Sequence, residues 1–200
     1  MPKSYSENER THIKRRLMEE ARLCLDRFGL RKTTVDELVK RVNIPKGTFY
    51  LFYESKELLF FDVLSEFQNE VQAKLFREIS SQKDGINPST LTRLLWELYK
   101  AVEKSFLLKF VTNGELELLI RKLPPRVAQE HAAVDDLHVE HLLSLVPNMK
   151  KDKLQVFSAA LRGIFLSMLH KHEIGAEVFD DALKMMIHGV VLQMFEEESI

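Results

Sequence analysis

Residues 33–59 read TTVDELVKRVNIPKGTFYLFYESKELL, and this stretch predicts two short helices joined by a tight turn. Thr34 is a candidate N-cap, and Glu37, three residues later, can complete a capping box with it. The apolar residues of the first short helix follow the i, i+3, i+4, i+7 pattern at Val35, Leu38, Val39 and Val42. Asn43 tolerates the left-handed backbone conformation, and Pro45 fits the first turn of a new helix. The chain between these two residues is therefore expected to turn sharply.

The second short helix is expected over residues 45–52, and a longer amphipathic helix flanks the pair on each side. The preceding helix covers residues 10–28, and Gly29 marks its end because glycine adopts a positive φ at low cost. The following helix covers residues 56–79, with Ser55 as its N-cap. Helical periodicity continues over residues 90–110, 126–146, 152–171 and 177–196. Two short helices joined by a turn and braced by a longer first helix form a helix-turn-helix.

The composition favours an all-α globular protein. Of the 200 residues, 45% are hydrophobic and 30% charged, and only seven are glycine, which disfavours a fold with many tight β-turns. Cys24 is the single cysteine, so no disulfide or cysteine-based zinc site forms within one chain, and a reducing, cytoplasmic location is expected. The N-terminus has no apolar signal segment and no stretch approaches 18 uncharged apolar residues, so neither export nor membrane insertion is expected.

Positive charge is concentrated in the N-terminal part of the chain. Residues 1–56 contain 13 Lys and Arg against 8 Asp and Glu, a balance of +5. Residues 57–200 contain 16 against 22, a balance of −6. A basic segment of this kind binds a polyanion such as DNA, or it is simply a solvated basic surface. The charge pattern alone leaves both interpretations open.

The motifs of residues 33–59 resemble the DNA-binding signature of the TetR family. The features that carry the resemblance are the paired threonines, the helix-turn spacing, the core KGTFY at residues 46–50 and the SKE at residues 55–57. The resemblance covers roughly residues 10–60, and the all-helical pattern extends it to the remainder of the chain.

The resemblance implies an all-α protein of two domains. A three-helix head with the helix-turn-helix would occupy residues 1–56, and a larger helical effector-binding and dimerisation domain residues 57–200. The implied function is that of a transcriptional regulator, most often a repressor, which binds a palindromic double-stranded DNA operator as a homodimer and is released by a small-molecule effector. No catalytic residue, cofactor or metal ion is expected.

The residues expected to contact DNA lie in and around the second short helix. Gly47 lets the backbone approach the duplex closely, and Lys46 and Thr48 lie in the first turn, the part that usually reaches base edges. Tyr50 and Lys56 are placed to bind phosphates. The full set is Thr34, Lys46, Gly47, Thr48, Tyr50, Leu51 and Lys56.

Three positions depart from the usual family pattern. Leu51 stands where a polar or aromatic residue is common, and Phe52 where His or Tyr is common, and neither side chain can form a hydrogen bond. Leu51 can still touch a thymine methyl group. Asn43 replaces the usual glycine of the turn, which its tolerance of the left-handed conformation permits. The DNA sequence of the operator therefore cannot be inferred from that of a relative. Phe49 is expected to be a core residue that holds the three-helix head together.

The last two predicted helices carry more apolar residues than one core face needs, which predicts a partner chain against them. Residues expected at this dimer interface are Phe157, Ala160, Ile164, Met186, Val190 and Met194. Ala159 and Gly163, one turn apart, permit a close helix crossing, either between two subunits or within one chain.

An apolar effector pocket is expected in the C-terminal domain. Its candidate lining residues are Trp96, Tyr99, Phe106, Phe110, His131, His138, Phe165 and Met168. Aromatic residues at helical spacing also fit an ordinary core. His131, His138 and His141 fall on one side of their helix near Asp135, which suits a metal site, polar groups of a pocket, or ordinary helix surface.

Two other classes of protein fit the sequence less well. A helical enzyme needs a catalytic arrangement, yet the chain has no His-Glu-x-x-His, phosphate loop or glycine-rich dinucleotide motif, and His172-Glu173 lacks a second histidine. A nonspecific DNA-binding protein would carry positive charge along much of its length, whereas here the excess ends near residue 56.

Overall fold

The chain folds into helices in a computed structural model that describes residues 5–82, 85–127, 143, 146 and 149–195. No strand occurs within these residues, and the expected all-α class is confirmed. The chain divides into two compact units, which are treated separately below. The first unit is Met1–Asn69 with Ser105–Pro124, and the second is Glu70–Lys104 with Pro125–Ile200. None of the helices in the described ranges has the length and apolar character needed to cross a membrane.

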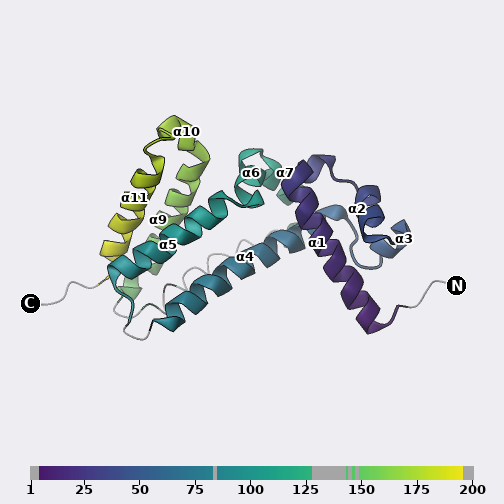
Figure 1. Cartoon of the computed structure of the whole chain (residues 1–200), viewed down its shortest axis with the longest axis horizontal. Coiled ribbons are helices and arrows are strands. Elements are labelled where there is room, and N and C mark those ends of the chain that lie inside the picture. Colours follow the sequence, from purple (N-terminus) through teal and green to yellow (C-terminus); the bar gives the residue numbers. More distant parts are fainter. Residues whose placement is uncertain (1–4, 83–84, 128–142, 144–145, 147–148, 196–200) are drawn as a thin grey trace, which may run out of the picture. The chain divides into compact units, whose positions relative to one another are not determined.

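The first unit combines the N-terminal helices with a segment that follows much later in the chain (Figure 1). Its helices are α1 (Glu7–Lys32), α2 (Val35–Val42), α3 (Lys46–Phe49), the first half of α4 (Lys56–Ser81), α6 (Phe106–Thr112) and α7 (Glu115–Lys122). α1 packs against α2, α6 and α7. The predicted boundary between functional domains at residue 56 stays a prediction, but the packing adds residues 105–124 to the N-terminal helices.

The long α1 is anchored at its start and interrupted near its end. At the start, the Ser6 hydroxyl accepts the N–H of Glu9 while the Glu9 carboxylate accepts the N–H of Ser6, a complete capping box. Near the end, Gly29 has φ 74° and ψ 179°, and helix then resumes to Lys32. The positive φ predicted for Gly29 is confirmed, but the helix runs past it. Its buried side comprises Ile13, Leu17, Ala21, Cys24, Leu25 and Leu30.

Some helices end earlier than their apolar periodicity predicts. Residues 90–110 form two helices instead of one, because the Ser105 hydroxyl accepts the N–H of Leu107 and starts α6 anew. α3 ends at Phe49 instead of residue 52, because the N–H groups of Leu51 and Phe52 bond the carbonyls three residues back, at Thr48 and Phe49, as in a turn. The helix expected over residues 126–146 falls largely outside the described residues.

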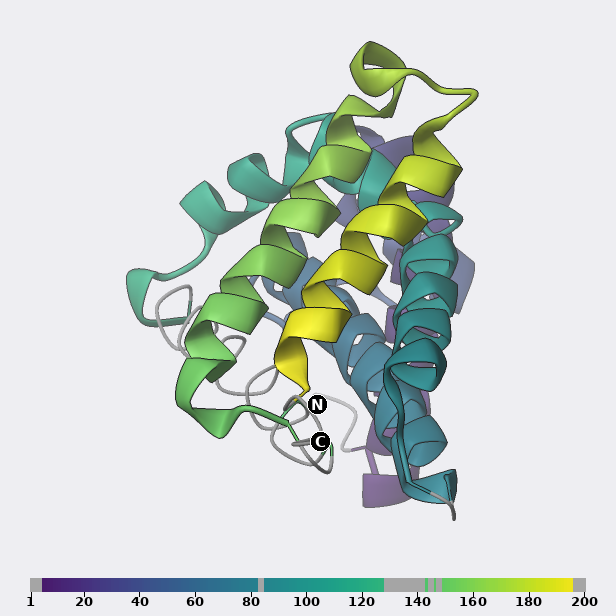
Figure 2. The same ribbon diagram turned by 90° about the vertical axis from the view of Figure 1, so that its left-hand side faces the viewer.

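The second unit contains α5, α9 and α11, of which α9 and α11 lie side by side and α5 packs on α11 (Figure 2). Its described elements are α5 (Pro88–Glu103), a 3-10 turn (Lys151–Lys153), α9 (Leu154–Ser167), a 3-10 turn (Met168–His170), α10 (Lys171–Ile174) and α11 (Phe179–Met194). One side of α11 is fully buried, at Phe179, Leu183, Ile187, Val191 and Met194. The break predicted at Ile174-Gly175 is confirmed, since α10 ends at the first and the second has φ 122°.

Charged side chains tie α5, α10 and α11 together within the second unit. Lys100 pairs with Glu103 and, at 2.8 Å, with Asp180. Lys171 Nζ lies 2.7 Å from Glu103 and 3.2 Å from Asp180. We call these four residues the side-chain network. Burial raises the pKa of Glu103, but the hydrogen bonds from Lys100 and Lys171 outweigh it, and the pKa is lowered.

Candidate nucleic-acid interface

The predicted helix-turn-helix is present as α2, a three-residue turn and α3 (Figure 1). The Thr34 hydroxyl accepts the N–H of Glu37 and caps α2, as predicted. The return half of the predicted capping box is replaced, because the Glu37 carboxylate binds Arg41 at 2.7 Å. Asn43 has φ 60° and ψ 50°, so the left-handed turn expected of it is confirmed. Pro45 immediately precedes α3 with φ −61°.

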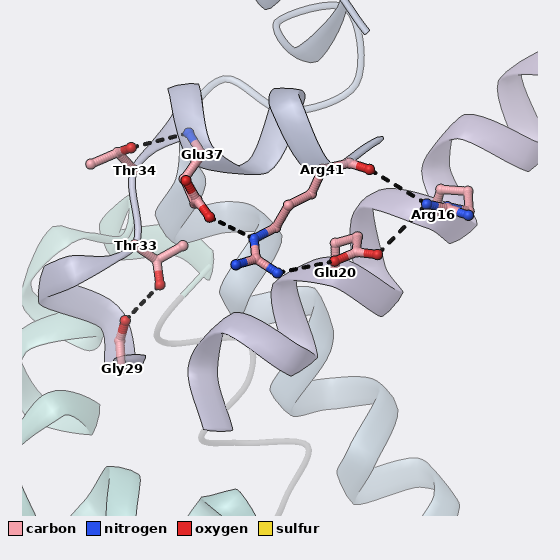
Figure 3. A network of polar contacts seen from close by, with 7 residues as sticks. All are labelled: Arg16, Glu20, Gly29, Thr33, Thr34, Glu37 and Arg41. Atoms are coloured by element: carbon pink, nitrogen blue, oxygen red, sulfur yellow. Dashed lines mark hydrogen bonds and ion pairs between the residues drawn. The ribbon is translucent and has the colours of Figure 1, made fainter. Parts of the chain in front are cut away.

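Polar side chains hold α2 against α1 (Figure 3). Arg41 reaches Glu20 of α1 at 3.7 Å as well as Glu37 of its own helix. Arg16 of α1 lies 3.6 Å from Glu20 and donates to the backbone carbonyl of Arg41 at 3.5 Å. With the buried Leu38 and Val39 of α2, these contacts fix the base of the helix-turn-helix.

Three of the side chains that the sequence predicts for DNA contact, Lys46, Tyr50 and Leu51, are exposed in α3 or directly after it. Tyr50 and Leu51 are 51% and 53% exposed. A Cβ built on Gly47 meets nothing within 4 Å, so the fold itself does not demand glycine there. Lys46 is exposed and pairs with Asp36 at 2.9 Å. An exposed pair of this kind contributes little stability and is readily given up for a phosphate or a base.

Thr48 and Phe49 face the inside of the first unit. Phe49 is fully buried, as predicted, with its ring edge-on to Tyr50 at 5.3 Å between ring centroids. Thr48 is only 6% exposed, and its hydroxyl is hydrogen-bonded to the Tyr5 hydroxyl at 3.1 Å. A base contact from Thr48 therefore needs this bond to be exchanged, and it stays a prediction.

Lys56 has backbone partners inside the protein. Its ammonium donates to the carbonyls of Leu30 at 2.9 Å and Thr33 at 2.6 Å. Burial lowers the pKa of Lys56 below its ordinary value. The phosphate contact predicted for Lys56 is untested. The hydrogen bonds to the two carbonyls give lysine a structural role at this position, which the sequence motif does not reveal.

Glu115 is a residue that sequence reasoning missed. It is buried at the start of α7, and its carboxylate accepts the N–H of Leu30 at 3.0 Å and of Arg31 at 3.5 Å. Glu115 and Leu30 are 85 residues apart, and an acidic residue in the first turn of a helix is unremarkable in sequence. The one local signal in the sequence is the break at Asn113-Gly114, which marks the start of the helix that carries Glu115.

The residues predicted for an effector pocket are divided between the two units. Phe106 and Phe110 are buried in the first unit, where Phe106 packs edge-on against Phe67 at 5.3 Å between centroids. In the second unit the buried Tyr99 donates its hydroxyl to the carbonyl of Leu161 at 2.7 Å, which gives it a structural role. Met168 is buried and Phe165 half-buried. The pocket predicted from these residues stays untested.

A surface groove of about 560 Å³ runs between α5 and α11 in the second unit. It is lined by Ser89, Thr92, Arg93, Trp96, Asp181, Lys184, Met185 and His188. Trp96 is the member of the predicted effector set that lines it. His131, His138, His141 and Asp135 lie outside the described residues, and within the described part no group of three or more His, Cys, Asp and Glu is placed to hold a metal ion.

Half of the predicted dimer-interface residues are buried within a single chain. Phe157 and Ile164 of α9 and Met194 of α11 are at most 6% exposed in the second unit. Met186 is exposed, and Ala160 and Val190 are half-buried. Sequence periodicity showed that α9 and α11 are apolar on more than one side but did not separate the inner side from the outer, and the dimer interface stays a prediction.

Comparisons with known proteins agree with this geometry. Residues 17–63 match the family model described as bacterial regulatory proteins, tetR family. The uncharacterised HTH-type transcriptional regulator YhgD of Bacillus subtilis is 34% identical over 61 residues, which are 30% of this chain and 32% of YhgD. The match thus spans about a third of that relative's length.

Solved structures are similar over nearly the whole chain. A putative TetR-family regulator from Mesorhizobium loti has a TM-score of 0.66 at 15% identity, over 94% of this chain and 96% of its own. FadR from Thermus thermophilus, a TetR-family repressor solved with lauroyl-CoA, has a TM-score of 0.59 at 19% identity, over 93% and 97%. At these identities the likeness shows the fold: an N-terminal helix-turn-helix followed by a helical C-terminal part.

Proposed function

We propose that the chain is a transcriptional repressor of the TetR type that binds a palindromic operator as a homodimer, because residues 17–63 match the model of that family and solved TetR-family regulators share the fold. The proposed repressor is released from DNA when it binds a small-molecule effector. The match to the family carries DNA binding as the general function. Dimerisation and the class of effector are supported by the observations that follow.

The observation that carries DNA binding is the surface of α3. Gly47 has open space beside its Cα, and Tyr50 and Leu51 are half exposed next to Lys46. Glycine in a helix costs about 0.5–1 kcal/mol relative to alanine, and no neighbour within the first unit requires it here. A partner outside the chain that comes close to the backbone explains the glycine, and DNA in the major groove is such a partner.

Substitution of Gly47 separates this explanation from a purely structural one. Gly47→Ala should leave thermal stability unchanged or slightly higher, because alanine favours helix. The variant should lose affinity for a duplex selected by the unaltered protein from a random library, because the methyl group holds the backbone away from DNA. A random duplex of equal length is the control, and it also tests the nonspecific alternative. Undiminished affinity for the selected duplex would remove the main support for α3 as the reading helix.

Dimerisation is supported by matching exposed rows on two neighbouring helices of the second unit. Both rows have i, i+4, i+7 spacing with glycine at the centre: Ala159, Gly163 and Leu166 on α9, and Met185, Gly189 and Leu192 on α11. A Cβ on either glycine would meet nothing within 4 Å. Rows of small and apolar residues that are left open allow a second copy of the two helices to pack closely against them.

The dimer proposal predicts the effect of a charge in this row. A Cβ at Gly189 has open space within the described residues, so Gly189→Glu should yield a folded monomer in sedimentation, because it buries a charge in the subunit interface. Lys184→Glu, on the same helix but in the groove beside α5, is the matched control and should stay dimeric.

For the effector, an apolar or amphipathic compound fits the proposal best. The FadR structure holds lauroyl-CoA, a long acyl chain with a polar head, in a protein of the same fold. Lauroyl-CoA is therefore the first compound to titrate into the complex of this chain with its selected duplex. Coupling between effector and DNA typically changes affinity about 5- to 150-fold.

A further inference from the structure

The backbone turn at residues 29–33, where α1 is interrupted and ends before α2, is held by charged side chains from two other helices of the first unit. On the N–H side, the Glu115 carboxylate accepts from Leu30 at 3.0 Å and from Arg31 at 3.5 Å. Glu115 is only 8% exposed, and Leu30 is fully buried. Hydrogen bonds from backbone N–H groups to a buried carboxylate are among the stronger ones in proteins.

The same turn is held on its carbonyl side by Lys56, the first residue of α4. The ammonium donates to the carbonyls of Leu30 and Thr33 at 2.9 and 2.6 Å. The Thr33 hydroxyl closes the turn on itself by donating to the carbonyl of Gly29 at 2.8 Å (Figure 3). We call Glu115, Lys56 and the backbone between them the backbone clamp.

Gly29 shows how closely Glu115 approaches the turn. A Cβ built on Gly29 would lie 2.5 Å from both carboxylate oxygens of Glu115, and its φ of 74° is itself unfavourable for other residues. The positive φ and the close approach occur at one residue. A methyl group at position 29 would therefore have to displace the Glu115 carboxylate as well as adopt an unfavourable φ.

The clamp is also balanced in charge. Glu57, next to Lys56, is buried and pairs with Lys122 at the end of α7 at 3.1 Å. Glu57 and Lys122 lie near enough to act electrostatically on Lys56, whereas Glu115 and Lys56 themselves bind the turn. A buried charge that loses its partner is costly, so each member of the set constrains the others.

The turn leads directly into the DNA-binding helices, since Thr34, the N-cap of α2, follows Thr33. We propose that Glu115 is a positioning residue for DNA binding, which with Lys56 fixes the turn from which the helix-turn-helix starts. This inference rests on the proposed DNA-binding function. It makes the segment of α6 and α7 a part of the DNA-binding apparatus, although it lies outside the sequence motif that identifies the family.

Two substitutions of Glu115 test this role, each measured under conditions where the protein is fully folded. Glu115→Gln keeps the length of the side chain but leaves one N–H facing an amide group. Glu115→Asp keeps the charge but withdraws it from the turn. Each should weaken binding to the duplex selected by the unaltered protein by about tenfold, within the usual range for coupling between residues. Glu117→Gln is the matched control, since Glu117 is exposed in the same first turn of α7.

Backbone amide exchange supplies a second readout that does not depend on DNA. In the unaltered protein the Leu30 amide should exchange slowly, and in both Glu115 variants much faster, while Glu117→Gln leaves it unchanged. Rapid exchange of this amide in the unaltered protein overturns the proposal even if no Glu115 variant folds.

The possible outcomes distinguish this inference from the proposed function. Folded Glu115 variants that bind the selected duplex as tightly as the unaltered protein overturn the positioning role alone. An equal loss on selected and random duplexes also overturns it, because a displaced helix-turn-helix loses base contacts before backbone contacts. Failure of the unaltered protein to select any duplex overturns the proposed function, and the positioning role with it.

Discussion

The two compact units both fix helices with partly buried charges, but those charges have different kinds of partner. In the first unit, Glu115 and Lys56 bind backbone groups of a single turn. In the second unit the charges bind one another, in the side-chain network of Lys100, Glu103, Lys171 and Asp180. A backbone group cannot exchange its partner without moving the chain, whereas two ammonium groups and two carboxylates can redistribute their pairs. The first arrangement specifies a position, and the second mainly contributes stability.

The largest expected effect is that of a methyl group at Gly29. Gly29→Ala should destabilise the first unit by about 3–4 kcal/mol, the sum of the positive φ and the displaced Glu115 bonds. Gly85→Ala is the matched control in the second unit, because Gly85 has φ 84° but open space around it. It should cost about 1–2 kcal/mol. Chemical unfolding, monitored by amide exchange in α1 and α2, measures the loss of unfolding free energy in each variant. Equal losses in Gly29→Ala and Gly85→Ala would mean that the backbone clamp does not constrain the turn.

A smaller effect is expected when the side-chain network loses one carboxylate. Glu103→Gln should destabilise the second unit by about 1–2 kcal/mol at pH 7, because Asp180 still binds both lysines. Trp96, the single tryptophan, reports this unit by fluorescence. A loss as large as that of Gly29→Ala would contradict the idea that this network redistributes its pairs.

The same variant has a predictable pH dependence. The pKa values of Glu103 and Asp180 are lowered in the folded state, so their stabilisation is present above the ordinary carboxyl values of about 4. It is lost as the pH falls through the lowered values. The difference between Glu103→Gln and the unaltered protein should therefore shrink below about pH 4. A difference that stays constant down to pH 2 would show that the charge of Glu103 is not what stabilises the unit.

The smallest expected effect separates Lys56 as a backbone ligand from Lys56 as a phosphate ligand. Lys56→Met should destabilise the first unit by about 1 kcal/mol, since two carbonyls lose a donor while the burial of a charge is relieved. If the ammonium stays on Leu30 and Thr33 when DNA is bound, the salt dependence of binding is unchanged. If it binds a phosphate, the slope falls by about one unit per subunit. A salt series with the selected duplex measures which of the two holds.

The lowered pKa of Lys56 gives this variant a second signature. The folded state binds the Lys56 proton less tightly than the unfolded chain, because burial disfavours the charge. The stability of the unaltered protein should therefore rise with pH between the lowered value and the ordinary value of about 10.4. In Lys56→Met this contribution is absent, and comparison of the two pH profiles isolates it.

Features that depend on neighbours in sequence could be predicted. The cap at Thr34, the left-handed turn at Asn43 and the positive φ of Gly29 all follow from the chemistry of one or two adjacent residues. The break at Ser105 could not, because the apolar spacing continues through it and a serine inside a helix is common. Local patterns therefore defined the helix-turn-helix better than the helices after it.

Contacts between residues that are distant in the chain could not be predicted. Glu115 approaches a turn 85 residues earlier in the chain, and no local signal announces such a contact. Lys56 looks like a phosphate ligand because it starts a helix, and only the fold reveals the carbonyls that bind it. Phe157 and Ile164 look like interface residues because their helix is apolar all round, and only packing shows which side is covered.

The discontinuity of the first unit has a consequence for how the protein is made on the ribosome. Glu115 is synthesised 85 residues after Leu30, which takes roughly 4 to 17 s at translation rates of about 5–20 residues per second. During that interval the helix-turn-helix has emerged without the carboxylate that binds its leading turn. A nascent chain that ends before residue 115 therefore exposes α3 on an unfinished support, and the first unit is complete only as α7 leaves the exit tunnel.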